Sequence, residues 1–353
     1  MLERLHIRNF RGFRDLRVDP LHRINLIAGR NDTGKSTLLE AIYLLGSAAD
    51  PQLAVNEHVM RSEGVTVAGP TSMAETIWKP LFFELRTDGP TEIAGRHSSI
   101  GSMSLKLALE KPVTTELARD KEDGKLPAIR ADEPVLAFTY VDPQAGEISG
   151  RARETADKVS YDRSDPMDEY TPFGAAILKP GAGNIKLDAI QLGKLRKQKR
   201  GGLLLDALRA VEPKLQSIED NSSSGAPMIW VDIGLRELLS LPVMGNGMTH
   251  VARIVLNATE LQDGVLLVDE IENGLHHSVL QNVWRVVEKI AEQFNVQVFA
   301  TTHSFECVQA AHSALGADGF GLHRLELVDG TTLCVTYDED AIDGAIGHNL
   351  EVR

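Results

Sequence analysis

The chain has 353 residues, of which 42% are hydrophobic and 25% charged, as is ordinary for a globular protein of one large domain or one domain with a sizeable insertion. Its formal net charge of -13 at pH 7 repels polyphosphate backbones, which argues against nonspecific nucleic-acid binding by the surface as a whole. The two cysteines, Cys307 and Cys334, form no CxxC pair, so neither a disulfide framework nor a zinc site is expected.

The N-terminal segment predicts neither export nor membrane insertion. It is charged and alternating where a secretory signal would carry an apolar block, and the sequence has no run of about eighteen apolar residues. We therefore expect a soluble, cytoplasmic protein that makes no membrane contact.

The first strong motif is a glycine-rich loop between an expected strand and an expected helix. Apolar residues alternate over 24–28 as in a short strand, and they recur at helical spacing over 38–45 before Gly46 as a helix stop. The segment between them matches GxxxxGK[ST] in the context that this motif requires. It consists of Gly29, Arg30, Asn31, Asp32, Thr33, Gly34, Lys35 and Ser36, followed by Thr37.

Each fixed position of this loop has a chemical reason. Gly29 and Gly34 allow backbone angles that turn successive N–H groups toward an anionic oxygen, and the following helix directs its positive dipole end to the same place. Lys35 adds a positive charge at the outer phosphates, and the Ser36 hydroxyl is small enough to bind Mg²⁺. The loop therefore predicts a site for ATP with Mg²⁺ rather than a plain strand-to-helix turn.

A second motif consists of a continuous apolar run, Val265–Val268, that ends in two acidic residues. This pattern is typical of a buried parallel strand whose carboxyl end opens at a site. Asp269 is predicted to hold Mg²⁺ through water, and Glu270 to polarise the water that attacks the phosphate.

The segment after these acids places a histidine at the same sheet edge. A helical apolar stripe over 279–290 is followed by a second strand over 296–300 and then by His303. A strand–helix–strand unit is parallel, so both polar strand ends meet, and His303 would contact a terminal phosphate beside Asp269. Asp269 follows Lys35 by 234 residues (269 − 35 = 234), so a large segment separates the two halves of the predicted site.

Together these residues resemble the ABC-type ATPase heads of the branch that contains OLD-family proteins, structural-maintenance-of-chromosomes (SMC) proteins and RecF. "LHIRNFRGFRDLRV" is similar to the opening strand and turn of that branch, and "GRNDTGKST" to its Walker A motif. "LLVDEIENGLHHSVL" is similar to its Walker B and D-loop, and "ATTHS" to its H-loop. The match is nearest to stand-alone OLD-type ATPases, including those of anti-phage systems.

The resemblance implies an α/β P-loop NTPase of the ABC-ATPase type, with a mixed β-sheet core flanked by helices. It divides the chain into an ATPase core over 1–46 and 240–353 and a region over 47–239 that continues the core sheet and carries a helical and β insertion. The closing sequence also looks like the family's hairpin and helix, with Asp329-Gly330 as the tight turn.

Further site residues are implied by the resemblance alone. Gly245, Asn246 and Gly247 occupy the place of a signature segment that binds the nucleotide of a partner subunit, which implies a head-to-head homodimer or higher oligomer. They lack the Ser-Gly-Gly-Gln of transporter ATPases. Arg11 and Phe13 lie in the turn that approaches the nucleotide, with a surface arginine and a core phenylalanine as the alternative interpretations.

The middle of the chain gives weaker signals. The expected Q-loop region over 78–83 contains no glutamine, so it receives no metal-ligand role. The remaining patterns predict short strands, polar loops, one helix and a break. The strands are expected at 84–85 and 104–109, the loops at 118–134 and 161–174, the helix along 202–218 and the break at 221–225.

A basic segment, Lys194–Arg200, has two interpretations. It is either a solvated helix end or a patch for nucleic-acid phosphates or an acidic partner protein. Only 50 residues follow His303 (353 − 303 = 50), too few for the Toprim nuclease domain that many OLD proteins carry in the same chain.

The expected function is slow ATP hydrolysis at composite dimer sites, with the ATP state controlling a separately encoded effector, often a nuclease, in anti-phage defence. The alternative is an ATP-gated DNA clamp of the RecF type in repair or on chromosomes, which the acidic charge and the absence of long heptad repeats disfavour. A transporter's ATPase subunit is a third, weaker class.

Overall fold

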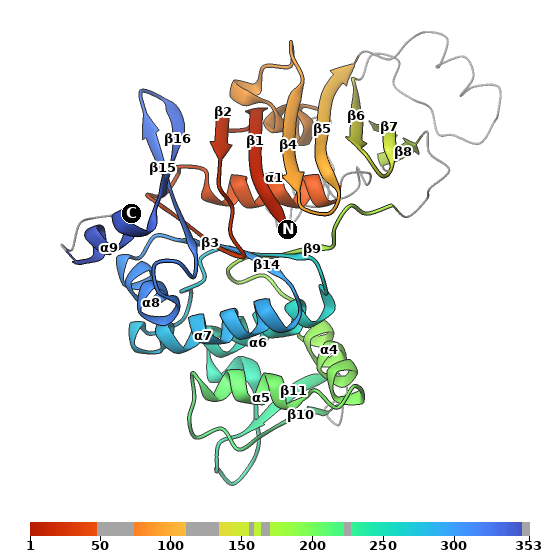
Figure 1. Cartoon of the computed structure of the whole chain (residues 1–353). Coiled ribbons are helices and arrows are strands. Elements are labelled where there is room, and N and C mark those ends of the chain that lie inside the picture. The colour runs from red at the N-terminus through yellow and green to blue at the C-terminus, as the bar shows by residue number, and fades with distance from the viewer. Residues whose placement is uncertain (48–73, 111–133, 155–158, 164–169, 222–226, 348–353) are drawn as a thin grey trace, which may run out of the picture.

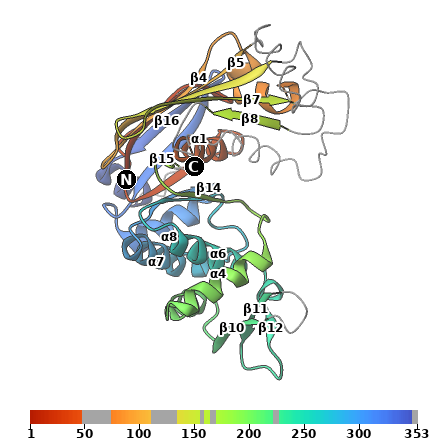
Figure 2. The same cartoon turned by 90° about the vertical axis from the view of Figure 1, so that its right-hand side faces the viewer.

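Two large β-sheets, with one helix between them and further helices below, organise the chain (Figure 1). The computed structural model describes residues 1–47, 74–110, 134–154, 159–163, 170–221 and 227–347. Seen from the side, an antiparallel sheet arches over helix α1 (Lys35–Gly46), the second sheet lies beneath α1, and the remaining large helices lie under that sheet (Figure 2). This stacking buries α1 between two sheets.

The antiparallel sheet contains seven strands within the described residues, in the order β2-β1-β4-β5-β6-β7-β8. The opening strands pair with strands from the middle of the chain, so this sheet crosses the boundary at residue 46 that the sequence suggested. The strand bounds are β1 Leu2–Phe10, β2 Phe13–Val18, β4 Thr91–His97, β5 Gly101–Glu110, β6 Val135–Asp142, β7 Gly146–Glu154 and β8 Val159–Arg163.

The central sheet carries the predicted motifs and has the order β16-β15-β3-β14-β13-β9. All neighbouring strands are parallel except the β15–β16 hairpin, and β14 pairs with β3 in the register Val298 to Ile24. The carboxyl ends of β3, β13 and β14 therefore lie at one edge, as predicted. The bounds are β3 Ile24–Gly29, β9 Ala175–Leu178, β13 Val265–Val268, β14 Gln297–Thr302, β15 Gly321–Val328 and β16 Thr331–Tyr337.

Three of the helices below the central sheet, α4, α7 and α8, are capped at the N-terminus by a side chain. Asn184, His276 and Ser304 each accept a hydrogen bond from a backbone N–H of the first turn, which satisfies a donor that has no partner inside the helix. The bounds are α4 Ile185–Lys197, α5 Gly202–Arg209, α6 Asn246–Glu260, α7 His277–Gln293, α8 Phe305–Leu315 and α9 Glu339–Gly347.

Several short elements complete the fold. A small antiparallel sheet, β10-β11-β12, lies beside α4 and α5 at the far end of the molecule (Figure 1). Its strands are β10 Ser217–Asn221, β11 Met228–Asp232 and β12 Leu239–Ser240. The short turns of helix are η1 Ala74–Trp78, η2 Lys79–Leu81, η3 Phe83–Leu85 and η4 Leu241–Met244.

The apolar run of β13 is continuous because both faces of the central sheet are buried. Val265 and Leu267 belong to the core that contains α1 and the antiparallel sheet. Leu266 and Val268 belong to the core formed with helices α4 to α8. Side chains of a strand alternate between its faces, so a strand buried on both sides needs apolar residues at every position.

Two predicted elements of the middle region are wrong. Residues 84–85 form a 3₁₀ turn and no strand, because Glu84 and Leu85 have φ of 50° and 59°, which strand geometry does not allow. The helix predicted along 202–218 ends at Arg209 as α5, and residues 217–221 form β10. Pro213 lies between them and cannot continue a helix.

Other predictions for the middle region have mixed outcomes. The strand at 104–109 is confirmed as part of β5. Residues 161–163 belong to β8, so the loop predicted at 161–174 begins too early. The loop at 118–134 and the break at 221–225 lie almost wholly outside the described residues. In the part of the chain that the structure describes, every helix is too short or too polar to cross a membrane.

Candidate nucleotide-binding site

The glycine loop joins the end of β3 to the start of α1. Gly34 is the N-cap of α1 and has φ of 94°, and a Cβ there would lie 2.6 Å from a ring carbon of Phe13. Only glycine combines this backbone angle with so close a neighbour. The first N–H groups of α1 have no partner inside the helix, so they remain available to an anion at its N-terminus.

The Lys35 side chain lies across the mouth of the loop. Its ammonium group donates to the carbonyl oxygens of Gly29 at 2.7 Å and of Arg30 at 2.8 Å, and the residue is 8% exposed. Burial lowers the pKa of Lys35, while Asp269 and Glu270 oppose this shift. The acids therefore lie close enough to interact with the lysine, as the predicted site requires.

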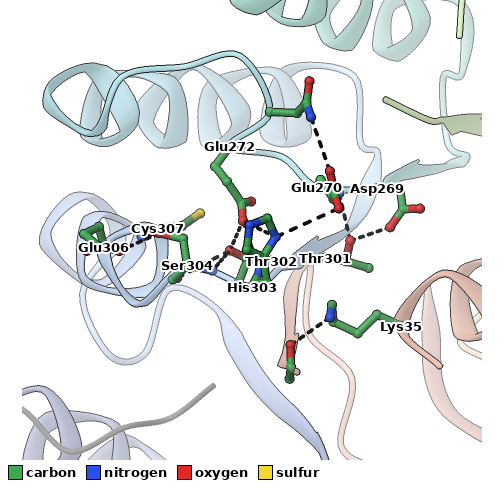
Figure 3. A network of polar contacts seen from close by, with 12 residues as sticks. Lys35, Asp269, Glu270, Glu272, Thr301, Thr302, His303, Ser304, Glu306 and Cys307 are labelled. Atoms are coloured by element: carbon green, nitrogen blue, oxygen red, sulfur yellow. Dashed lines mark hydrogen bonds and ion pairs between the residues drawn. The ribbon is translucent and has the colours of Figure 1, made fainter. Parts of the chain in front are cut away.

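The two acids after β13 are tied to the end of β14 by one hydroxyl group. Thr301 Oγ1 donates to Asp269 Oδ1 at 2.6 Å and accepts the backbone N–H of Glu270 at 2.8 Å (Figure 3). Thr301 is fully buried. This bridge fixes the start of the acidic loop relative to the neighbouring strand.

Glu270 turns sharply away from β13. Its φ is 50°, an uncommon value for a residue with a side chain, and such backbone strain often occurs at functional sites. Asn273 Nδ2 donates to Glu270 Oε2 at 3.2 Å, while the glutamate side chain is 38% exposed. The carboxylate is thus held by a neighbour and open to the solvent side.

His303 lies beside the acids, as predicted, and its side chain is half exposed. Nδ1 of its ring is 3.9 Å from Glu270 Oε1 and 3.3 Å from Glu272 Oε1 (Figure 3). Glu272 also accepts hydrogen bonds from Thr302 Oγ1 at 2.7 Å and from the His303 backbone N–H at 3.0 Å. Sequence reasoning missed the contacts of Thr301, Thr302 and Glu272.

A pocket of about 720 Å³ brings the two distant halves of the predicted site together. Its lining includes Asn31 to Thr37 from the first half and Asp269 and Glu270 from the second. Glycine-loop residues Gly29 and Arg30 and the histidine His303 stand outside this lining. The juxtaposition of lysine, hydroxyl and acids is the arrangement that the motifs predicted.

Two further segments, to which the sequence analysis assigned no site residue, also line the pocket. Phe83 and Glu84 line it from the η3 turn, and the β15–β16 hairpin lines it through Leu327, Gly330 and Thr332. The Asp329-Gly330 turn had been recognised as a hairpin, but a turn pattern carries no information on what the hairpin covers. Thr332 Oγ1 donates to the Thr33 carbonyl at 3.4 Å, which joins the hairpin to the glycine loop.

Arg11 and Phe13 have different positions. Arg11 lines the pocket and pairs with the buried Glu40 of α1, with Arg11 Nη1 and Glu40 Oε2 2.9 Å apart. Phe13 is fully buried in the core beneath Gly34, so the prediction that it contacts the nucleotide is wrong and the core interpretation holds. The apolar ring supports the loop from below because a fully buried side chain offers no surface to a ligand.

The predicted signature segment lies outside the pocket of its own chain. Gly245 is the N-cap of α6, and Gly245 and Asn246 are exposed. Gly247 is buried against Gly274, where a Cβ on Gly247 would lie 2.4 Å from the Gly274 carbonyl oxygen. The start of α6 therefore packs directly on the loop that carries the two acids.

The basic segment 194–200 is largely engaged with its neighbours. Three of its cations contact side chains of the same chain, which favours the interpretation as a solvated helix end over a nucleic-acid patch. The pairs are Lys194 with Glu260 (3.0 Å), Arg196 with Asp220, and Arg200 with the ring of Phe294 (4.4 Å).

The oxygen donors in the pocket suit Mg²⁺. The Ser36 hydroxyl and the Asp269 carboxylate both line it, and Mg²⁺ prefers hard oxygen ligands. Two protein donors are fewer than an octahedral ion needs, and phosphate oxygens and water commonly supply the others. The residues present therefore fit a magnesium ion that is shared with a nucleotide.

Comparison with known protein families identifies the family to which this chain belongs. Residues 24–307 match the family described as "AAA domain, putative AbiEii toxin, Type IV TA system". The chain belongs to this family. The match begins with β3 and ends within α8, so it contains the glycine loop, both acids and His303.

This AAA-domain protein is similar to curated proteins of two kinds. It is 24% identical over 381 residues to an ATP/GTP phosphatase of Helicobacter pylori, which covers 99% of this chain and 97% of that protein. It is 49% identical over 45 residues to the DNA replication and repair protein RecF of Idiomarina loihiensis, which covers 13% of either chain.

Two solved structures share the fold of this AAA-domain protein. An SMC head bound to the C-winged helix domain of ScpA has a TM-score of 0.52 at 13% identity and covers 98% of this chain and 99% of that chain. An SMC head with an extended coiled coil, bound to the C-terminal domain of ScpA from Pyrococcus furiosus, has a TM-score of 0.52 at 12% identity over 99% of either chain. The predicted class, an SMC/RecF-like ABC-type ATPase with a mixed α/β fold, is confirmed, while the narrower OLD-type assignment stays a prediction.

Proposed function

We propose that this AAA-domain protein binds ATP with Mg²⁺, hydrolyses it slowly, and uses its ATP state to control a separately encoded effector. The observation that carries the proposal is the single pocket in which Lys35 and Ser36 face Asp269 and Glu270. These groups come from opposite ends of the chain, and phosphoryl transfer depends on such positioned charges. The similarity to an ATP/GTP phosphatase supports the same activity.

Binding relies on the start of α1. The backbone N–H groups around Gly34 and the Lys35 ammonium group surround the β- and γ-phosphates, because helix N-termini favour anions. Ser36 and Asp269 would hold Mg²⁺, which would supply positive charge beside the phosphates. Thr301 keeps the Asp269 carboxylate in place for this role.

Hydrolysis relies on Glu270. Its carboxylate accepts a proton from a water molecule while the water oxygen bonds to the γ-phosphorus and the bond to the β–γ bridging oxygen breaks, which yields ADP and phosphate. His303, beside Glu270, contacts the terminal phosphate. Arg11, anchored by Glu40, lies on the nucleotide side of the pocket.

The complete site requires a second copy of the chain. Gly245 and Asn246 are exposed at the positive end of α6 and lie outside the pocket of their own chain, which supports their action on a partner's nucleotide. Two chains would then close head to head around two ATP molecules.

The partner proposed for this switch is an effector protein, with a nuclease of an anti-phage system as the first candidate. The family description names a putative toxin of a Type IV TA system, which supports a role in a system of more than one gene product. A RecF-type DNA clamp is the second candidate, supported by the short RecF similarity. Two observations argue against a DNA clamp: cations of the basic segment 194–200 contact other side chains of the same chain, and the net charge of the chain is negative.

The ATPase proposal is tested with three variants of the full chain. Glu270→Gln should lower kcat at least about 100-fold and trap an ATP-bound dimer, because the proton acceptor is lost while phosphate binding remains. Lys35→Ala should abolish ATP binding, and Glu292→Gln, an exposed exchange of the same kind on α7, should change nothing. Phosphate release and light scattering measure these outcomes. Wild-type turnover by Glu270→Gln would refute the assignment of the base.

The two biological roles are separated by DNA binding at two salt concentrations. A clamp predicts ATP-dependent binding to duplex DNA with a steep salt dependence, because protein cations displace counterions from phosphates. The effector proposal predicts no such binding. Glu270→Gln is the suitable form for this assay because its dimer would persist.

A further inference from the structure

Glu272 is a buried acid whose purpose is explained neither by metal binding nor by water activation. Its side chain is 10% exposed and lies between the loop after β13 and the end of β14 (Figure 3). Burying a carboxylate is costly unless hydrogen bonds or a partner charge stabilise it. Its contacts therefore indicate which neighbours depend on it.

The side-chain contacts of Glu272 among the described residues are made by Oε1 and involve residues 302 and 303. Thr302 Oγ1 donates to it at 2.7 Å, the His303 backbone N–H at 3.0 Å, and the His303 ring nitrogen Nδ1 lies at 3.3 Å. One oxygen thus accepts a hydrogen bond from the main chain of His303 and lies beside its ring. Oε2 is buried and has no hydrogen-bond partner in the described part of the chain.

This arrangement distinguishes the two nitrogens of the His303 ring. Nδ1 faces the Glu272 carboxylate and, at 3.9 Å, the Glu270 carboxylate, which favours a proton on Nδ1 over a lone pair. The ring proton then stays on Nδ1, and Nε2 is the nitrogen left to meet other groups. A neutral histidine with free choice would distribute its proton between both nitrogens.

We propose that Glu272 is a positioning residue that acts through His303, fixing the orientation of its ring and keeping the ring proton on Nδ1. The fixed orientation of the ring then sets how His303 meets the terminal phosphate. This inference rests on the proposed ATPase function and assigns to Glu272 a part in it. Glu270 remains the group that accepts the proton from water.

A double-mutant cycle tests whether Glu272 acts through the histidine. Glu272→Gln keeps the shape and an oxygen acceptor but removes the charge, and we expect kcat to fall about tenfold with little change in KM. The same substitution in a His303→Ala background should cause no further loss, because interacting residues are non-additive. Glu306→Gln is the matched control and should keep wild-type kcat, because Glu306 on α8 accepts a hydrogen bond from the Ser304 hydroxyl.

An equal loss of kcat in both backgrounds would overturn the proposal. The proposal would also be overturned if Glu272→Gln lowered the thermal unfolding midpoint by the same amount in the wild-type and in the His303→Ala background. Glu272 would then be a structural residue. The carboxamide can still accept from Thr302 and from the His303 backbone N–H, so we expect the midpoint to stay close to that of the wild type.

A readout without ATP separates this inference from the proposed function. ¹⁵N NMR of histidine side chains, with the His303 signal assigned by its absence from His303→Ala, reports which ring nitrogen carries the proton. Wild type should show a protonated Nδ1, and Glu272→Gln should shift the ring toward the other tautomer. An unchanged tautomer would overturn the role of Glu272 even in an active ATPase, whereas a wild type that hydrolyses no ATP would defeat the proposed function alone.

Discussion

Replacing Thr301 by valine tests whether one hydroxyl group holds the two acids of the candidate site at the end of β14. Valine has nearly the shape of threonine but cannot form hydrogen bonds. In the native chain the Thr301 hydroxyl donates to Asp269 at 2.6 Å and accepts from the Glu270 N–H at 2.8 Å, and the residue is fully buried. The substitution removes both bonds without opening a cavity.

The expected loss follows from these two contacts. A hydrogen bond to a charged group contributes about 1.5–3 kcal/mol, and a buried N–H left without its partner costs about 1–3 kcal/mol. The added methyl group of valine returns about 1 kcal/mol. We therefore expect Thr301→Val to lower the free energy of unfolding by about 1.5–5 kcal/mol. We also expect it to raise the Mg²⁺ concentration needed for half-maximal ATPase activity.

Urea unfolding and magnesium titrations of phosphate release measure these effects. Thr259→Val is the control, because that hydroxyl donates only to the Leu256 carbonyl at 2.7 Å within α6, and its effect should stay within about 0.5 kcal/mol. If Thr301→Val were as stable as the control and equally active at low Mg²⁺, the bridge would not hold the acids in place.

Two further predictions concern the glycine loop and pH. Gly34→Ala should abolish binding of a fluorescent ATP analogue while circular dichroism keeps its helical signal, because φ is 94° and the new Cβ would lie 2.6 Å from Phe13. Burial lowers the pKa of His97, His250 and His323 from 6.5 to about 4. Above pH 6.5 all three histidines are neutral in the folded and in the unfolded chain, so they do not lower the free energy of unfolding there. As the pH falls from 6.5 to 4, the unfolded chain takes up protons that the folded chain does not, so the free energy of unfolding should fall.

Each of these predictions has a clear contrary result. Binding of the analogue by Gly34→Ala with wild-type affinity would show that the loop tolerates a side chain beside Phe13. A urea midpoint that stays constant from pH 7 down to pH 5 would show that the buried histidines are protonated equally in folded and unfolded chains, and His323→Gln should flatten part of the expected slope.

The parts of the site that the sequence predicted are those with a local pattern. The glycine loop over 29–36 stands between a strand and a helix whose apolar residues follow the periods of 2 and 3.6, and the apolar run over 265–268 reflects burial on both faces. Right-handed strand–helix–strand connections then place Asp269 and His303 at one edge. Site residues that lie within such segments can be predicted from the sequence alone.

The residues that were missed contact partners far away in the chain. Thr301 and Thr302 have no periodic pattern, and their role depends on the acids about thirty residues earlier being adjacent across a parallel pair. A usable signal was present, since two hydroxyls and three acids follow two strands already expected to be neighbours. The pocket contribution of the β15–β16 hairpin had no such signal, because tertiary packing alone brings the hairpin there, whereas Phe83 lies in the region where a Q-loop was expected.

The wrong predictions also have physical causes. The apolar stripe along 202–218 continues past the end of α5 because Val211, Leu215 and Ile218 happen to keep the helical spacing. Of these three residues, Ile218 alone belongs to β10, and Pro213 was the overlooked stop. For Phe13 the resemblance suggested the nucleotide and a core position was the alternative. The core interpretation holds because a large apolar ring is most stable when buried.

The position of β3 between β14 and β15 determines when this protein can fold during synthesis. Ile24 pairs with Val298, which is 274 residues later (298 − 24 = 274), so the first strand of the sheet has no partner until the ribosome has made most of the chain. During synthesis this apolar strand has neither of its neighbouring strands to pair with, and sheets built from such distant pairs form slowly. We expect chaperones to bind the growing polypeptide, and any fragment released before β14 to be unable to retain ATP.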